Sequence, residues 1–299
     1  MNTRCGYVAL LGRPNAGKST LLNQAVGAKV SIVTPKAQTT RFRVSGILLR
    51  ELGPDQSQII LIDTPGLFAP KRRLDRAMVQ TAWDSVAGAD LACMLVDAFR
   101  ARPDDLAEPL AALAKTGRRR WLVLNKIDLL PRDKLLPLAD TLGKMGQFDE
   151  VFMISALKRD GVDTMLDAMG RAMPVGPFLY PPDELTDQTD RMLAAELVRE
   201  QIFLQTREEI PYGASVETES FKDLNDGSAR IDVTIYVART GHKMIILGES
   251  GARIKSIGSK ARAELERLLE RRVHLFLHVK DRPGWDEETA RLRALGLDG

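Results

Sequence analysis

Residues 12–19 read GRPNAGKS and match the pattern of a phosphate-binding loop, in which glycines, a lysine and a hydroxyl side chain stand at fixed spacing. An apolar run precedes this stretch and a helix-like run follows it, which is the context that makes such a match specific. Backbone N–H groups and the helix N-terminus would hold the phosphates, Lys18 would reach the terminal phosphates, and the Ser19 hydroxyl would bind magnesium. We therefore predict nucleotide contacts from Gly12, Arg13, Pro14, Asn15, Ala16, Gly17, Lys18, Ser19 and Thr20.

The stretch D-T-P-G at residues 63–66 ends another apolar run, roughly 45 residues beyond the phosphate-binding loop. Its aspartate, Asp63, would help to hold the magnesium ion, and the backbone N–H of Gly66 would donate to the γ-phosphate. Thr64 and Pro65 stand between them and belong to the predicted site. This tetrapeptide alone could be a simple turn, but its position after a strand and behind a phosphate-binding loop favours the nucleotide site.

Between these two motifs lies the polar stretch Thr34–Arg43, which contains two adjacent threonines. One threonine hydroxyl from such a loop completes the magnesium shell when GTP is bound, and this contact orders the loop. We favour Thr40 over Thr39 for this role, the alternative being that both are surface threonines. The predicted magnesium ligands are Ser19, Thr40 and Asp63.

The stretch N-K-I-D at residues 125–128 ends a later apolar run and would select the base. The Asp128 carboxylate can accept hydrogen bonds from the ring N–H and the exocyclic amine of guanine, whereas adenine has no donors at that edge and would leave a buried carboxylate unpaired. The stretch S-A-L at residues 155–157 would bring backbone N–H groups near the guanine oxygen. The predicted ligands are GTP or GDP with Mg²⁺, and the predicted base site comprises Asn125, Lys126, Asp128, Ser155, Ala156 and Leu157.

Hydrolysis needs a group that orients the attacking water, and many GTPases use a glutamine directly after the glycine of the D-x-x-G motif. Here that residue is Leu67, whose apolar side chain cannot orient water. We expect Asn15 to contribute instead by holding a monovalent cation, K⁺, beside the β- and γ-phosphates. The alternatives are that Asn15 only shapes the loop and that a partner supplies the missing group. The predicted catalytic residues are Asn15, Lys18, Thr40 and Gly66.

Apolar runs bounded by turn signals alternate with helix-like stretches over residues 7–173, which predicts βαβ units. Several runs are continuous in Val, Ile and Leu, as in strands that helices cover on both faces. We therefore predict an α/β domain over residues 1–173, with a mainly parallel sheet between two layers of helices. The expected strands are Tyr7–Leu11, Val44–Leu52, Gln58–Ile62, Leu91–Val96, Trp121–Leu124 and Val151–Ile154, and the expected helices are Lys18–Val26, Leu74–Val86, Asp104–Lys115, Lys134–Lys144 and Val162–Ala172.

Four prolines and a glycine fall within residues 173–182, and such a stretch cannot continue a helix. We place a linker at residues 174–182 and a second, α+β domain at residues 183–299. Its expected order is α-β-β-α-α-β, with elements at Leu185–Glu209, Ala214–Lys222, Ala229–Val237, His242–Leu247, Ala252–Glu270 and Val273–Val279.

A G-x-x-G loop at residues 248–251 separates the last two predicted helices and resembles the loop of a KH domain. In KH domains this loop holds backbone phosphates while bases lie in an apolar groove, and basic residues after it would supply the counter-charge. Glu249 stands where such loops commonly carry a basic residue, and the alternative interpretation is a helical hairpin with a glycine turn. The predicted RNA-binding residues are His242, Lys243, Gly248, Glu249, Ser250, Gly251, Arg253, Lys255 and Lys260.

Composition limits the class of protein. The 299 residues are 44% hydrophobic and 28% charged, typical of a soluble globular protein, and no run approaches the roughly 18 apolar residues that span a bilayer. The net charge of +3 does not by itself indicate a polyanion partner, but residues 239–282 contain eleven Lys or Arg against five Asp or Glu. Cys5 and Cys93 lie in strand-like runs, so we expect free thiols in a reducing cytoplasm.

The chain resembles the bacterial Era family over essentially its full length. The matching stretches are GRPNAGKST, KAQTTR, IDTPGL, NKID and SAL in the first domain, and LGESGARIKSIG and VKDRPGW in the second. The resemblance implies a P-loop GTPase domain followed by a type II KH domain. It further implies binding of small-subunit (16S) ribosomal RNA near its 3′ end, a role in assembly of the 30S subunit, and a cytoplasmic location with peripheral contact to the inner membrane. We expect a monomer.

Two other classes stay open on the sequence alone. The first is a GTP-dependent switch that acts on a protein or membrane partner, with the second domain as an adaptor. Salt-dependent retention of single-stranded RNA by residues 183–299 would distinguish it from an RNA-binding protein. The second is a metabolic ATPase, which Asp128 disfavours.

Overall fold

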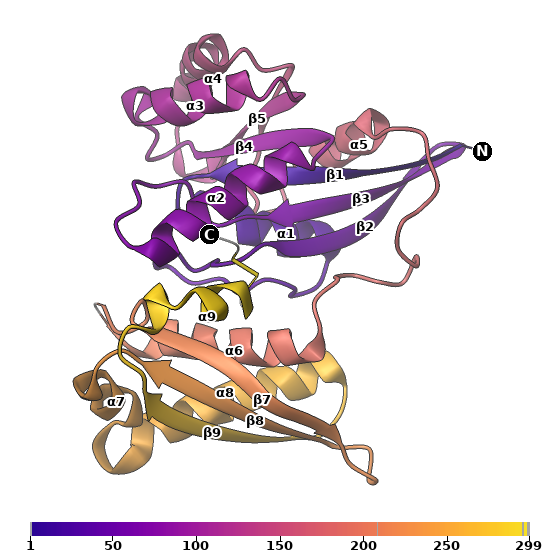
Figure 1. Cartoon of the computed structure of the whole chain (residues 1–299). Helices are drawn as coiled ribbons and strands as arrows, with labels where there is room; N and C mark the ends of the chain where they lie inside the picture. Colours follow the sequence, from indigo (N-terminus) through magenta and orange to yellow (C-terminus); the bar gives the residue numbers. More distant parts are fainter. Residues whose placement is uncertain (1, 208, 295, 298–299) are drawn as a thin grey trace.

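The structure is a computed structural model that describes residues 2–207, 209–294 and 296–297. Residue 1 of the predicted first domain and residues 208, 295 and 298–299 of the predicted second domain lie outside this description. The chain forms two sheets, one above the other in Figure 1, and each has its own helices.

The first sheet has six strands in the order β2-β3-β1-β4-β5-β6. β2 pairs with β3 in the antiparallel sense and all other neighbours are parallel, which confirms the predicted mainly parallel sheet. The carboxyl ends of the parallel strands meet at one edge, where ligands bind in open α/β sheets. The strands are β1 (Thr3–Gly12), β2 (Val44–Leu52), β3 (Asp55–Asp63), β4 (Leu91–Asp97), β5 (Arg120–Asn125) and β6 (Glu150–Met153).

Helices cover both faces of this sheet because successive side chains of β1 point to opposite sides. Leu10 belongs to a buried cluster with Leu22 of α1, and its neighbour Leu11 belongs to another cluster with Leu110 of α3. Burial of each such side chain contributes about 1.5–3 kcal/mol. The helices are α1 (Lys18–Val26), α2 (Arg73–Ala87), η1 (Pro103–Leu106), α3 (Ala107–Lys115), η2 (Ile127–Leu129), α4 (Arg132–Gly146) and α5 (Val162–Ala172).

The second sheet has the order β7-β8-β9, with β7 antiparallel and β9 parallel to β8. Every second residue of β8, from Ile231 to Ile235, is fully buried in a cluster with residues of α6 and α8, so these helices cover one face. The predicted α-β-β-α-α-β order is confirmed. The elements are α6 (Asp190–Gln205), β7 (Ala214–Asp223), β8 (Ala229–Val237), α7 (Thr240–Leu247), η3 (Glu249–Gly251), α8 (Ala252–Leu269) and β9 (Val273–Asp281).

The helix predicted from Leu185 begins only at Asp190, so this boundary was wrong. Residues 185–187 instead run beside β2. Leu185 accepts a backbone hydrogen bond from Ile47, and the Ser45 hydroxyl donates to Asp187 at 2.9 Å. These contacts hold the segment extended, and the side chain of Thr189 then caps the helix by accepting from the backbone N–H of Met192.

The C-terminal segment returns to the first sheet. It contains η4 (Trp285–Glu287) and α9 (Thr289–Ala294), and Figure 1 shows α9 between α2 and the second domain. Trp285, Leu292 and Leu297 are buried in the same cluster as Leu74 of α2. These residues fall within the predicted second domain, and no pattern in the sequence indicates this contact.

Both cysteines are buried and free, as expected. No helix within the described residues is long and apolar enough to cross a bilayer.

Candidate functional site

The predicted phosphate-binding loop joins β1 to α1 at the carboxyl edge of the sheet. Gly17 has a φ of 100°, and a Cβ there would lie 2.2 Å from the Nδ2 atom of Asn125, so only glycine fits. Lys18 Nζ donates to the carbonyls of Gly12 at 3.1 Å and Arg13 at 3.3 Å. Burial lowers the pKa of Lys18 to about 8. The ammonium group thus lies inside the loop, where it can pair with phosphate oxygens.

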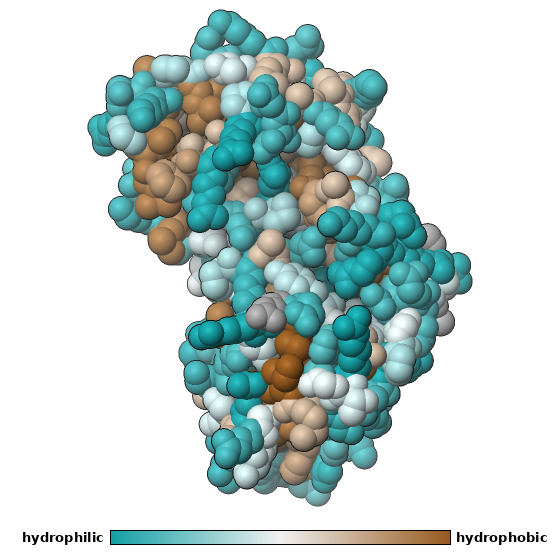
Figure 2. All heavy atoms as spheres, turned by 90° about the vertical axis from the view of Figure 1, so that its left-hand side faces the viewer, coloured by the Kyte–Doolittle hydropathy of each residue, from teal (hydrophilic) through white to brown (hydrophobic). Residues whose placement is uncertain are grey.

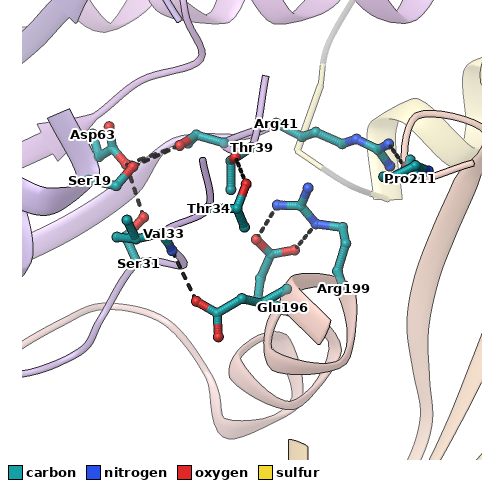
Figure 3. A network of polar contacts seen from close by, with 12 residues as sticks. Ser19, Ser31, Val33, Thr34, Thr39, Arg41, Asp63, Glu196, Arg199 and Pro211 are labelled. Carbon is teal, nitrogen blue, oxygen red and sulfur yellow. Dashed lines mark hydrogen bonds and ion pairs between the residues drawn. The ribbon is translucent and has the colours of Figure 1, made fainter. Parts of the chain in front are cut away.

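Hydroxyl groups converge on the Asp63 carboxylate at the end of β3. Its Oδ2 atom accepts hydrogen bonds from Ser19 at 2.6 Å, Ser31 at 3.0 Å and Thr40 at 3.2 Å, and Figure 3 shows Ser19 and Ser31 close to this carboxylate. Burial raises the pKa of Asp63, and its Oδ1 atom has no hydrogen-bond partner among the described residues. A set of hydroxyl and carboxylate oxygens with an unsatisfied buried oxygen suits Mg²⁺, which binds few protein oxygens and keeps several waters.

The two candidate threonines differ in what they contact. Thr40 Oγ1 lies 3.0 Å from Ser19 Oγ, within the predicted magnesium site. Thr39 Oγ1 lies 2.6 Å from Thr34 Oγ1 and donates to the Lys36 carbonyl, on the far side of the loop. This geometry favours Thr40. Ser31 was missed, because a serine without a surrounding motif gives no sequence signal.

Asn125 connects the phosphate loop to the base loop. Its Nδ2 atom donates to the Ala16 carbonyl at 2.8 Å, and its Oδ1 atom accepts from the backbone N–H of Ala156 at 2.9 Å. The side chain is buried. Asn125 therefore fixes the distance between the two halves of the nucleotide site.

Lys126 and Asp128 belong to the N-K-I-D stretch and follow β5 at the carboxyl edge of the sheet. The side chain of Ser155 donates a hydrogen bond that lowers the pKa of Asp128, so the carboxylate is ionised near neutral pH and can accept from guanine. Lys126 Nζ donates to the Asn15 carbonyl and to Asp97 Oδ2, both at 2.7 Å.

Lys18, Ser19, Thr40 and Lys126 line a cavity of about 360 Å³, a volume in the usual range for ligand sites. Its walls come from the phosphate loop, from residues 32–40 and from the ends of β4 and β5. Asp97 and Phe99 also line it, and neither is among the residues predicted from the sequence. Asp97 ends β4, so its position at the carboxyl end of a parallel strand was the signal that could have identified it.

Leu67 is buried in the core beside the sheet, so its side chain cannot reach a water molecule in the cavity. Its backbone N–H donates to the Gly12 carbonyl at 3.0 Å, which holds Gly66 against the phosphate loop. A Cβ on Gly66 would lie 2.8 Å from the backbone nitrogen of Pro14. The Asn15 side chain donates through Nδ2 to the Pro35 carbonyl at 3.2 Å, which joins the phosphate loop to residues 34–40.

The G-x-x-G loop forms the short helix η3 between α7 and α8. Beside it on α7, Met244 is 65% and Ile245 is 42% exposed, and Figure 2, viewed from the side of α7, shows hydrophobic residues of this domain among hydrophilic ones. Lys255 and Lys260 on α8 are exposed. An apolar surface thus lies next to a helix N-terminus and two exposed lysine side chains, as a KH groove requires.

His242 does not fit the predicted contact with RNA. It is only 8% exposed, because α7 directs its ring toward the backbone of Gly213. The neighbouring Lys243 pairs with Asp281 at 3.4 Å. The Arg253 guanidinium of α8 donates to the Ile245 carbonyl of α7, so it connects the two helices.

Comparisons with known proteins agree with this geometry. Residues 7–126 match the family described as 50S ribosome-binding GTPase, and residues 209–286 match the KH domain. GTPase Era of Afipia carboxidovorans is 49% identical over 99% of this chain and 95% of its own length. GTPase Era of Erythrobacter litoralis is 47% identical over 99% of this chain and 97% of its own length.

Two solved structures are similar over the whole chain. A variant of Era from Aquifex aeolicus bound to GDP·AlF₄⁻ has a TM-score of 0.92 and 39% identity, covering 98% of this chain and 99% of that one. Era in complex with MgGDPNP and nucleotides 1506–1542 of 16S ribosomal RNA has a TM-score of 0.91 and 38% identity, covering 99% of each chain. With its relatives aligned from end to end, the chain belongs to the GTPase Era family, whose members hydrolyse GTP.

Proposed function

We propose that this GTPase binds small-subunit (16S) ribosomal RNA near its 3′ end and thereby aids assembly of the 30S subunit. The observation that carries the proposal is the exposed apolar pair Met244 and Ile245 beside a G-x-x-G loop and two exposed lysines. The related Era structure that contains nucleotides 1506–1542 of 16S ribosomal RNA supports the choice of RNA.

In the nucleotide site, we assign the phosphate contacts to the backbone of residues 12–20 and to Lys18. Ser19 and Thr40 would hold Mg²⁺ directly and Asp63 through water. The ion would neutralise charge on the β- and γ-phosphates. The N–H of Gly66 would donate to the γ-phosphate, and Asp128 would read the guanine edge.

Asn15 is our candidate for the group that compensates for Leu67. Its Nδ2 atom donates to the backbone carbonyl of Pro35. The amide oxygen of the same side chain therefore points away from the Pro35 carbonyl. That oxygen would bind K⁺ beside the phosphates and add positive charge where negative charge develops. Turnover measured in potassium and in sodium buffers at equal ionic strength tests this, and equal rates would remove K⁺ from the mechanism.

The domain limits 1–173, 174–182 and 183–299, the monomeric state and the peripheral contact with the inner membrane belong to the proposal. The linker packs on the first sheet, where the Gln58 side chain accepts hydrogen bonds from Leu179 and Tyr180. Sedimentation of the purified chain tests the monomer, and flotation with lipid vesicles tests the membrane contact.

The RNA proposal is tested by fluorescence anisotropy with a labelled RNA that carries the 16S 3′-end sequence. Lys255→Gln and Lys260→Gln should each weaken binding and reduce the slope of log K against log salt by about one. Arg267→Gln, at the other end of α8, is the matched control and should bind as the unaltered chain does. If the full chain fails to retain RNA at low salt, the competing function on a protein or membrane partner gains support.

A further inference from the structure

The loop at residues 29–43 belongs in sequence to the first domain, yet much of it is packed on the second. Ile32 is 3% exposed and lies in the buried cluster that contains Val198 of α6. The backbone N–H of Val33 donates to Glu200 Oε1 at 3.1 Å, and Lys29 pairs with Glu200 at 2.7 Å. The first half of the loop is therefore held by α6.

Arg41 holds the second half of the loop. Its guanidinium donates to the backbone carbonyls of Ala214 at 2.7 Å, Pro211 at 2.9 Å and Tyr212 at 3.3 Å. Its Cζ atom also lies 5.5 Å from the centre of the Trp285 ring, a cation–π contact. Figure 3 shows the side chain extending away from Ser19 and Asp63 toward Pro211.

The environment of this guanidinium makes the contact specific. Arg41 is 4% exposed, and its hydrogen-bond partners are backbone carbonyls rather than carboxylates. A buried charge is stable only while such acceptors surround it. The carbonyls of residues 211–214 and the Trp285 ring thus suit a planar cation with several N–H donors. The guanidinium of arginine is such a cation, and the ammonium of lysine is not.

The residue before Arg41 is Thr40, whose hydroxyl lies 3.0 Å from Ser19 Oγ and 3.2 Å from Asp63 Oδ2. We propose that Arg41 is a positioning residue for GTP hydrolysis, through which the second domain holds Thr40 at the magnesium site. This inference rests on the role proposed above for Thr40. A shift of the loop by about 1 Å is enough to reduce catalysis up to 100-fold.

The test is single-turnover hydrolysis of GTP by the full chain while Mg²⁺ is titrated. Arg41→Gln should lower the maximal rate by about 10- to 100-fold and raise the Mg²⁺ concentration that gives half of it. Affinity for GDP should not change, because this threonine joins the magnesium shell only when GTP is bound. Arg43→Gln removes the same charge from an exposed side chain in the same loop and is the matched control.

Thr40→Ala separates this inference from the function on which it rests. Thr40→Ala should show the same magnesium effect. The double variant Arg41→Gln/Thr40→Ala should be no more impaired than the worse of the two single variants, since both substitutions act through one contact. An unimpaired Thr40→Ala variant would remove the proposed role of Thr40 and this inference with it. An impaired Thr40→Ala beside a normal Arg41→Gln would overturn this inference alone. Weaker GDP binding by Arg41→Gln would also overturn it, because the arginine would then serve the fold.

Discussion

The Asp128 carboxylate is the side chain on which the choice of base depends. Asp128→Asn places an amide donor against the donors of guanine, so the affinity for GTP should fall by about 10²–10⁴-fold. Xanthosine triphosphate offers a carbonyl where guanine offers an amine, and its affinity should rise. Competition with a fluorescent guanine nucleotide measures both.

Asp133→Asn is the control for this prediction, since it removes the same charge from an exposed position in the first turn of α4. It should leave both affinities unchanged. Retained preference for GTP in the Asp128→Asn variant would show that another group reads the base.

Residues within motifs could be assigned to the nucleotide site from the sequence, because each motif has a fixed spacing and directly follows a predicted strand. Asn125 was assigned to the base site, but the sequence could not show that its side chain joins two loops that are far apart in the chain. Ser31 stands outside any motif, so only the folded chain brings it to Asp63. Asp97 ends a predicted strand, which marked it as a candidate, but its contact with Lys126 is visible only in the fold. His242 is buried in the structure, which the sequence could not show, because its burial depends on how α7 packs against residues remote in the chain.

At the scale of elements, α2 directly follows the D-T-P-G stretch, and its start is fixed by Asp75. The Asp75 carboxylate accepts hydrogen bonds from the backbone N–H groups of Lys71 and Arg72, both at 3.1 Å. Asp75→Ala should lower the free energy of unfolding by about 1 kcal/mol, the usual contribution of such a cap. Urea denaturation monitored by circular dichroism measures the change.

The effect of Asp75 should depend on pH. Burial raises the pKa of Asp75, but the hydrogen bonds from Arg72 and Lys71 outweigh it and bring the pKa below the ordinary 3.8. A lowered pKa stabilises the fold above pH 4, and this contribution is lost as pH falls through the folded-state value. The difference from the unaltered chain should therefore shrink in acid. Asp140→Ala on the exposed face of α4 is the control, with an expected loss below about 0.5 kcal/mol.

Most helices and strands follow from periodicity, since continuous apolar runs and glycine or proline boundaries are local signals. The start of α6 does not, because residues 185–187 are held extended by hydrogen bonds to β2, more than 130 positions earlier in the chain. The short helix α9 was missed for the same kind of reason. Its residues are ordered by packing on α2 rather than by a helical pattern of their own.

At the scale of the whole molecule, each domain buries side chains that belong in sequence to the other. Ile32 of the first domain is buried in the second, while Trp285 and Leu292 are buried with residues of the first. A domain boundary drawn from composition cannot reveal such mutual burial, because the partners are remote in sequence. The consequence is that the conformation of residues 29–43 depends on both domains.

Trp285 is the largest side chain in this junction. It is fully buried, and its Nε1 atom donates to the Gly213 carbonyl at 3.1 Å. Trp285→Ala should destabilise the chain by about 3–5 kcal/mol and lower the urea midpoints of both domains. Phe276→Ala, at a side chain that is 44% exposed, should change the midpoints little. A Trp285→Ala chain whose first domain unfolds at the original midpoint would argue against this mutual burial.

The account as a whole predicts that the GTP site and the RNA groove communicate through residues 29–43 and their contacts on the second domain. The most direct measurement is the affinity of the full chain for 16S 3′-end RNA with Mg²⁺ and either a non-hydrolysable GTP analogue or GDP. Coupling free energies between sites usually change affinity 5- to 150-fold, and we expect about tenfold tighter binding with the analogue. Identical affinities in the two nucleotide states would contradict the account.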